Sequence, residues 1–147
     1  MILTRRSLIA AGSLAALTWP SSAHAASVTI YRMSGCGCCH KWSELMAEAG
    51  LPVTLSDVDD MAAIHSRLGV PDALQGCHAG EIGGYVIEGH VPPKDILRLL
   101  TDKPAARGLS VAGMPQGSPG METATTDPYQ VLLFQTDGTS KVYASYG

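Results

Sequence analysis

The sequence predicts a single α/β domain that ends in an added β-hairpin. Two observations lead to this class. Short segments rich in β-branched residues alternate with segments of helical periodicity. A turn signal also separates two strand-like segments near the C-terminus. The chain has 147 residues, and this length suits one domain with a modest core.

Residues 1–25 predict an export signal rather than a membrane anchor or a first core helix. Arg5-Arg6 supplies positive charge, residues 7–19 are mostly apolar, and Ala23-His24-Ala25 forms a small-x-small cleavage site. The arginine pair also resembles a twin-arginine signal, with a Sec signal as the alternative. We therefore expect a periplasmic protein whose domain spans residues 26–147.

The first half of this domain predicts two strand–helix units. Residues 28–31 and 53–55 are β-branched and apolar, as in strands. Apolar residues at helical spacing follow each strand, namely Trp42, Leu45, Met46 and Ala49, and then Met61, Ile64 and Leu68. Either Asp59 or Asp60 can cap the second helix, and Gly69 ends it.

The second half predicts a hairpin, a helix, a long loop and a second hairpin. Residues 77–91 read as a hairpin turning at Gly83-Gly84. Pro92-Pro93 opens a helix whose apolar side carries Ile96, Leu97, Leu99 and Leu100. Residues 103–128 predict a long functional or mobile loop. Strands at 131–134 and 141–146 then flank Asp137-Gly138, and the whole order matches a thioredoxin-like layout.

The charge balance excludes a nucleic-acid-binding role. The chain has 10 basic and 13 acidic residues. Loss of Arg5 and Arg6 with the signal leaves 8 basic residues and a net charge of −5. Nucleic-acid binding needs a basic face. No further apolar run is long enough to cross a membrane, so we expect no membrane span after signal cleavage.

The four cysteines point to a metal site. Cys36, Cys38 and Cys39 crowd the expected start of the first helix, where the helix dipole favours thiolates, and Cys77 lies where the facing loop of such a fold is expected. Converging thiolates select Cu(I), Zn(II) or an iron–sulfur cluster. Two alternatives stay open. Cys36 and Cys39 form a Cys-x-x-Cys redox pair, and four cysteines in an exported chain can form two disulfides.

Several histidines and methionines are weaker candidates. His78 should point away from Cys77 if the strand alternates regularly, and His90 lies at the hairpin exit. Each is either a structural histidine or a metal ligand or its hydrogen-bond partner. Met114 and Met121 are either thioether ligands or apolar side chains that pack the long loop against the core. We expect His40 to face outward and His65 to be structural.

Five motifs in order resemble the CopG-type copper-resistance family. They are Cys36-Gly37-Cys38-Cys39 with Trp42, Gly69-Val70-Pro71, Cys77-His78, the segment 83–92 and the segment 113–122. The resemblance implies a thioredoxin-like fold and a periplasmic protein that binds copper, as Cu(I), for resistance or handling.

The resemblance also assigns residues. It implies copper ligation by Cys36, Cys38, Cys39 and Cys77, in a site that can hold several ions. His78, His90, Met114 and Met121 lie in matching motifs. Copper ions and another periplasmic copper-resistance protein are the expected partners. We expect a binding protein rather than an enzyme, with a thiol–disulfide oxidoreductase or a copper redox protein as alternatives.

Overall fold

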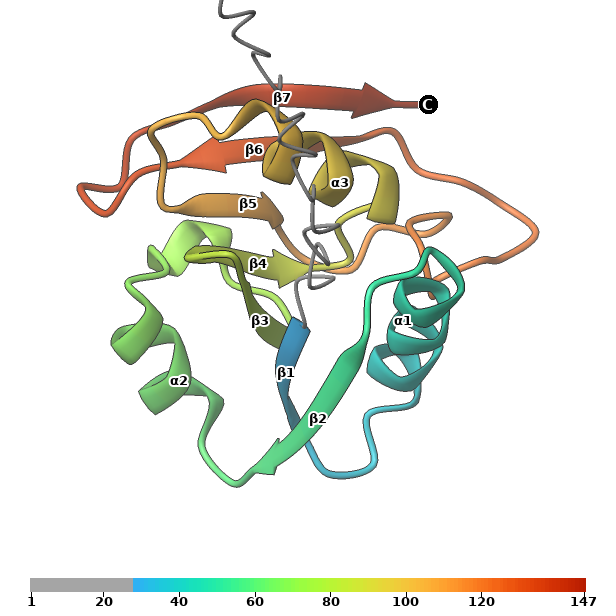
Figure 1. Ribbon diagram of the computed structural model, residues 1–147. Helices are drawn as coiled ribbons and strands as arrows, with labels where there is room; N and C mark the ends of the chain where they lie inside the picture. The colour runs from blue at the N-terminus through green and yellow to red at the C-terminus, as the bar shows by residue number, and fades with distance from the viewer. Residues whose placement is uncertain (1–27) are drawn as a thin grey trace, which may run out of the picture.

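The computed structural model describes residues 28–147 as one seven-stranded mixed sheet with three α-helices (Figure 1). The strand order is β2-β1-β3-β4-β5-β6-β7. The elements are β1 (Val28–Met33), α1 (Gly37–Glu48), β2 (Val53–Val58), α2 (Met61–Leu68), a 3-10 turn (Asp72–Leu74), β3 (His78–Ile82), β4 (Tyr85–Gly89), α3 (Pro93–Asp102), β5 (Gly108–Val111), β6 (Tyr129–Phe134) and β7 (Ser140–Tyr146).

The first four strands form the predicted thioredoxin-like unit. β1 pairs in parallel with β2, and β3 runs antiparallel to both β1 and β4. Helices α1 and α3 cover one face of the sheet, and α2 covers the other (Figure 1). This arrangement places the start of α1 beside the end of β1, the position predicted for the cysteines.

Two apolar clusters, one on each face, hold the layers together. On the α1 and α3 face, Trp42, Met46, Ile96 and Leu99 pack against the sheet and are fully buried. On the α2 face, Leu68 packs with residues that include Phe134. Burial of such side chains contributes about 1.5–3 kcal/mol each. Leu97, predicted on the buried side of α3, is instead 42% exposed, because the inner face of the helix carries Ile96 and the residues three and four positions after it, Leu99 and Leu100.

The ends of α2 follow the sequence signals. Asp60, not Asp59, is the N-cap, and its carboxylate accepts a hydrogen bond from the Ala63 N–H at 3.1 Å. Gly69 closes the helix in the left-handed region, at φ 70°. Glycine adopts this conformation without the steric cost that a Cβ brings.

The prediction of one long loop over residues 103–128 is wrong. Residues 108–111 form β5, which pairs in parallel with β4 and antiparallel with β6, and all four residues are buried. A four-residue strand that is buried on both faces shows no alternation of polar and apolar residues, so it leaves no periodic signal. The C-terminal addition is therefore three strands, which extend the sheet beyond β4 as β5-β6-β7.

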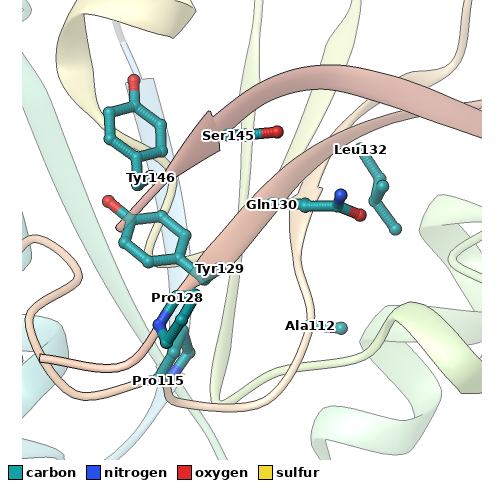
Figure 2. Close-up of a pocket in the computed structure, with 8 residues that line it drawn as sticks. All are labelled: Ala112, Pro115, Pro128, Tyr129, Gln130, Leu132, Ser145 and Tyr146. Carbon is teal, nitrogen blue, oxygen red and sulfur yellow. The ribbon is translucent and has the colours of Figure 1, made fainter.

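The predicted signal peptide, residues 1–25, lies outside the residues that the structure describes. Within residues 28–147, no helix has the length and apolar character needed to span a membrane. One shallow pocket of about 530 Å³ lies on the β6–β7 side, between residues that include Tyr129 and Tyr146 (Figure 2). None of the cysteines lines it.

Candidate metal centre

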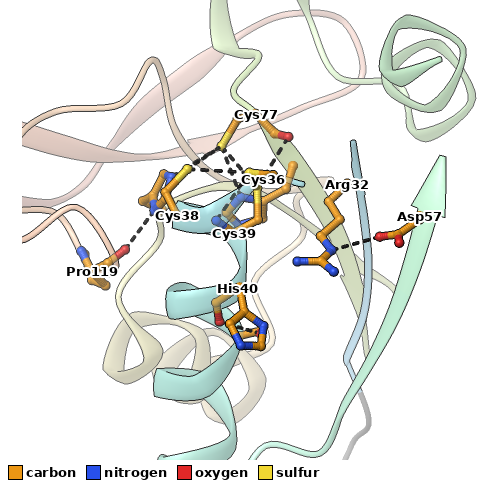
Figure 3. The surroundings of a disulfide bond; sticks show 11 residues. Arg32, Cys36, Cys38, Cys39, His40, Asp57, Cys77 and Pro119 are labelled. Carbon is orange, nitrogen blue, oxygen red and sulfur yellow. Dashed lines mark hydrogen bonds and ion pairs between the residues drawn. A yellow bond between two sulfur atoms is a disulfide. The ribbon is translucent and has the colours of Figure 1, made fainter. Parts of the chain in front are cut away.

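The four cysteine sulfurs converge from two separate segments (Figure 3). Cys36 caps α1, Cys38 and Cys39 lie in its first turn, and Cys77 directly precedes β3. The Sγ of Cys77 lies 3.8 Å from that of Cys38 and 3.6 Å from that of Cys39. All four Sγ atoms lie within 4.8 Å of one another. The donor set is therefore one that soft metal ions prefer.

Two of these sulfurs are joined. Cys36 and Cys39 form a disulfide, with their Cα atoms 5.4 Å apart, while Cys38 and Cys77 are free thiols. The bonded pair is the predicted Cys-x-x-Cys pair. The arrangement of two independent disulfides is not formed. In this state only two thiols can bind a metal as thiolates, and reduction of the disulfide makes four available.

The start of α1 is electrostatically suited to thiolates. The Cys36 Sγ accepts a hydrogen bond from the Cys39 backbone N–H at 3.3 Å. The first turn of the helix carries no acidic side chain that would oppose a negative charge. The unpaired backbone N–H groups of a helix start favour anions, so the start of α1 suits negatively charged ligand atoms.

Two buried histidines contact the Cys77 sulfur. His78 Nδ1 and His90 Nε2 each lie 3.4 Å from the Cys77 Sγ, so Cys77, His78 and His90 form a second group of converging donors. The expectation that His78 points away from Cys77 is wrong. Cys77 lies before the first residue of β3, where the regular alternation of side chains does not yet apply.

The ring of His90 has a defined orientation. Its Nδ1 lies 2.8 Å from the Pro119 carbonyl oxygen. A carbonyl only accepts, so Nδ1 carries the proton and the Nε2 lone pair faces Cys77. His78 packs between Trp42 and His90, with ring centroids 4.5 Å and 5.0 Å away. The tilted contact with Trp42 and the edge-to-face contact between the two histidines therefore hold both rings beside the sulfur.

Burial controls protonation at this site. It lowers the pKa of His78 to about 3, with a further contribution from His90, and it also lowers the pKa of His90. Both rings are therefore neutral at neutral pH. Burial, and then the proximity of Cys38, raises the pKa of the Cys77 thiol to about 12. The Cys77 thiol is therefore protonated at neutral pH, and a metal ion bound there would have to displace this proton.

The other two histidines lie away from the sulfurs. His40 is exposed, as predicted, and its Nε2 lies 3.3 Å from the Glu44 carboxylate. His65 is buried on α2, and its Nε2 lies 3.2 Å from Oε1 of Glu88, although not in hydrogen-bond alignment. Neither belongs to a group of converging metal-binding side chains among the described residues.

The methionines belong to the loop that follows β5. Met114 is 53% exposed, so its side chain does not pack the loop against the core, and Met121 is half-buried. The loop itself packs on the cysteine-bearing helix. A Cβ on Gly120 would meet the Trp42 nitrogen at 2.9 Å and the Cys38 oxygen at 3.0 Å. Copper ligation by either methionine stays a prediction.

Sequence reasoning missed one polar residue behind the site. Glu88 is fully buried in β4, and its Oε1 accepts a hydrogen bond of 2.6 Å from the backbone N–H of Gly76, the neighbour of Cys77. Burial raises the pKa of this carboxyl to about 8, and the Gly76 N–H opposes the shift. The available signal was an acidic residue inside the strand-like run Tyr85–Gly89.

Comparisons with known proteins agree with this geometry. The family described as "Protein of unknown function, DUF411" matches residues 74–121. No curated protein matches the chain. A solved structure named copper resistance protein CopG, form 1, is 43% identical with a TM-score of 0.77, covering 82% of this chain and 96% of that chain. Form 2 is 42% identical with a TM-score of 0.78, covering 83% and 98%. The identity extends over almost the whole of these solved chains, and on that basis the chain belongs to the CopG-type copper-resistance family.

Proposed function

We propose that this protein binds Cu(I) through Cys36, Cys38, Cys39 and Cys77 and handles copper in the periplasm as part of copper resistance. The observation that carries the proposal is the convergence of four Sγ atoms within 4.8 Å of one another. Thiolates are soft donors and select Cu(I) over harder ions. The name of the solved relatives, a copper resistance protein, supports copper as the metal.

The donor arrangement favours more than one copper ion. A single tetrahedral ion is usually bound by two separated pairs of cysteines, and three cysteines within four consecutive residues do not match that arrangement. Such closely spaced thiolates can instead each bridge two neighbouring ions. His78 and His90 extend the donor set beyond Cys77, and we include Met114 and Met121 as thioether ligands for ions that approach along the loop. Delivery of copper to another periplasmic copper-resistance protein completes the proposal.

The disulfide sets a condition on copper loading. Opening the Cys36–Cys39 bond consumes two electrons and two protons and yields two thiols, which lose their protons on binding Cu(I). We therefore expect copper to be loaded only under reducing conditions.

The same disulfide favours a second candidate function, a thiol–disulfide oxidoreductase that uses Cys36 and Cys39. A copper redox protein would combine the two activities.

Three measurements on one set of single cysteine-to-alanine variants separate these functions. They are the amount of Cu(I) bound per chain after anaerobic reduction, the growth of cells in copper, and the reduction of a model disulfide. A copper cluster needs every bridging thiolate, so all four variants should lose copper to comparable degrees. His40→Ala, whose exposed ring flanks Cys39 in sequence, should bind copper like the wild type.

An exchange enzyme would give the opposite pattern. It requires only the attacking thiolate and its partner, so Cys38→Ala and Cys77→Ala would stay active. Normal copper tolerance in these two variants, combined with efficient disulfide reduction by the wild type, would refute the copper-binding proposal.

A further inference from the structure

A buried carboxyl group lies behind Cys77. Glu88 is 0% exposed, and it lies in β4 two residues from Val86, a member of the apolar cluster on the α2 face. Glutamate is almost never fully buried without a partner, and burying a polar group costs free energy that an apolar residue would not. A leucine or methionine would fill this position at lower cost. The carboxyl therefore needs an explanation other than packing.

Glu88 has two polar neighbours. The Nε2 of His65 lies 3.2 Å from its Oε1 but out of hydrogen-bond alignment, and the hydrogen bond that the carboxyl does make leads to the cysteine loop. The Glu88 Oε1 accepts the 2.6 Å hydrogen bond from the Gly76 N–H, and Gly76 directly precedes Cys77. Gly76 also lies tightly over this part of β4. A Cβ there would come within 3.2 Å of the Gly89 Cα and 3.3 Å of the Glu88 Oε1. The hydrogen bond to Glu88 and the close approach to β4 therefore both constrain the position of the Gly76 backbone, directly before Cys77.

A second side chain, from the neighbouring strand β5, binds the same segment that leads into Cys77, residues 74–76. Ser110 of β5 lies beside Glu88 in the parallel register, and its Oγ donates to the Leu74 carbonyl at 2.7 Å. Two neighbouring polar groups of the sheet, one an acceptor and one a donor, therefore hold residues 74–76. The bond from Glu88 is the nearer to Cys77, which joins β3 only at the next residue.

We infer that Glu88 is the positioning residue of Cys77. Its carboxyl oxygen holds the Gly76 N–H and so keeps the Cys77 sulfur 3.8 Å from Cys38 and 3.6 Å from Cys39. Glu88 is not a member of either group of converging donor side chains. Its consequence for copper rests on the proposed function, whereas its consequence for the spacing of the sulfurs does not.

The spacing can be measured without copper. In a chain with Cys36→Ser and Cys39→Ser, only Cys38 and Cys77 remain, and two thiols plus oxidised glutathione give one protein disulfide plus two reduced glutathione molecules. The equilibrium constant reports the effective concentration of one sulfur at the other. We compare Glu88→Met, which removes the acceptor at similar size, with Glu88→Gln, which keeps an oxygen acceptor. Glu81→Met on β3, whose carboxylate binds Tyr31 near the surface, is the matched control.

The expected result is a selective loss. Glu88→Met should lower the effective concentration about tenfold, the equivalent of one lost hydrogen bond. Glu88→Gln and Glu81→Met should match the parent protein. Equal values for Glu88→Met and the parent would overturn the inference. If circular dichroism shows that Glu88→Met does not fold, Glu88→Asp, which withdraws the carboxyl by one methylene, replaces it with the same criterion.

A copper titration then separates this inference from the proposed function. In the otherwise native chain, Glu88→Met should bind less Cu(I) than Glu88→Gln after reduction. If the wild type binds no copper while the exchange equilibrium still depends on Glu88, the positioning role stands and the copper proposal fails. If copper binding is strong and identical in both Glu88 variants, the positioning role fails and the copper proposal stands.

Discussion

Because Gly120 has no Cβ, the loop after β5 can pack closely against the helix that carries the cysteines. Gly120 has φ 84°, in the left-handed region, and its backbone lies against the first turns of α1. The next residue back, Pro119, supplies the carbonyl that orients His90. The close approach of this loop is therefore tied to the geometry of a candidate ligand.

A substitution at Gly120 should cost more than the same substitution at Gly113. Gly113 also has a positive φ, 71°, but nothing lies within 4 Å of its Cβ position. Gly113→Ala should therefore lose only about 1–2 kcal/mol from backbone strain. Gly120→Ala adds a clash with the backbone at Trp42 and Cys38, worth about 1–3 kcal/mol more. Urea unfolding of both variants measures the difference, and equal losses would contradict the close packing.

At the scale of elements, α2 shows local chemistry determining a helix boundary. Both Asp59 and Asp60 are exposed acidic residues before the helix, yet only the side chain of Asp60 accepts from the Ala63 N–H. The helix has only eight residues, so its first turn is a large share of its hydrogen bonds. Leu68 of α2 belongs to the apolar cluster on this face of the sheet, so a shift of the helix would disturb the packing of the core.

Removal of the cap should therefore distinguish the two aspartates. Asp60→Ala should lower the free energy of unfolding by about 1 kcal/mol, because one helix N–H loses its partner. Asp59→Ala should change it by less than about 0.5 kcal/mol. Thermal or urea unfolding of the two variants tests this. A larger effect at Asp59 would show that the chain enters α2 differently.

At the scale of the whole molecule, the stability of the fold is linked to pH through its buried histidines. Burial lowers the pKa of His65 below its ordinary value of 6.5. The unfolded chain therefore binds a proton at this residue more readily than the folded chain does. As pH falls below about 6.5, the unfolded state gains a proton at His65, and this contribution destabilises the folded protein. The neighbouring Glu88 acts in the opposite direction, because burial raises its pKa to about 8 and the folded state therefore holds its proton more tightly than the unfolded chain does.

His65→Gln should make the protein less sensitive to acid. Below pH 6.5, and down towards the lowered pKa of His65, the wild type should lose up to about 1.4 kcal/mol per pH unit more than the variant, the effect of one proton. His78 and His90 titrate in both proteins and cancel in the difference. Glu88 cancels as well, because the burial and the Gly76 N–H that set its pKa are present in both proteins. Urea unfolding at several pH values measures the slopes. Parallel slopes would mean that His65 takes up its proton without unfolding.

The local features of this protein can be predicted from its sequence alone. β1, the capped helices and both hairpins follow from patterns within a few residues, as does the crowding of Cys36, Cys38 and Cys39 at the start of α1. Propensity, capping and turn chemistry act over such short distances. The thioredoxin-like order of these elements is predictable for the same reason, because the order of elements restricts how a sheet can be wound.

The features that depend on contacts between distant residues appear only in the folded structure. The sequence placed Cys77 near the other cysteines only through the fold, and the structure added His78 and His90 at 3.4 Å from its sulfur. β5 was missed because a short, buried strand has no periodicity, and Glu88 was missed with it, since the meaning of a buried carboxyl appears only when Gly76 is beside it. Burial and hydrogen-bond partners across 12 or more residues are properties of packing, and no local pattern encodes them.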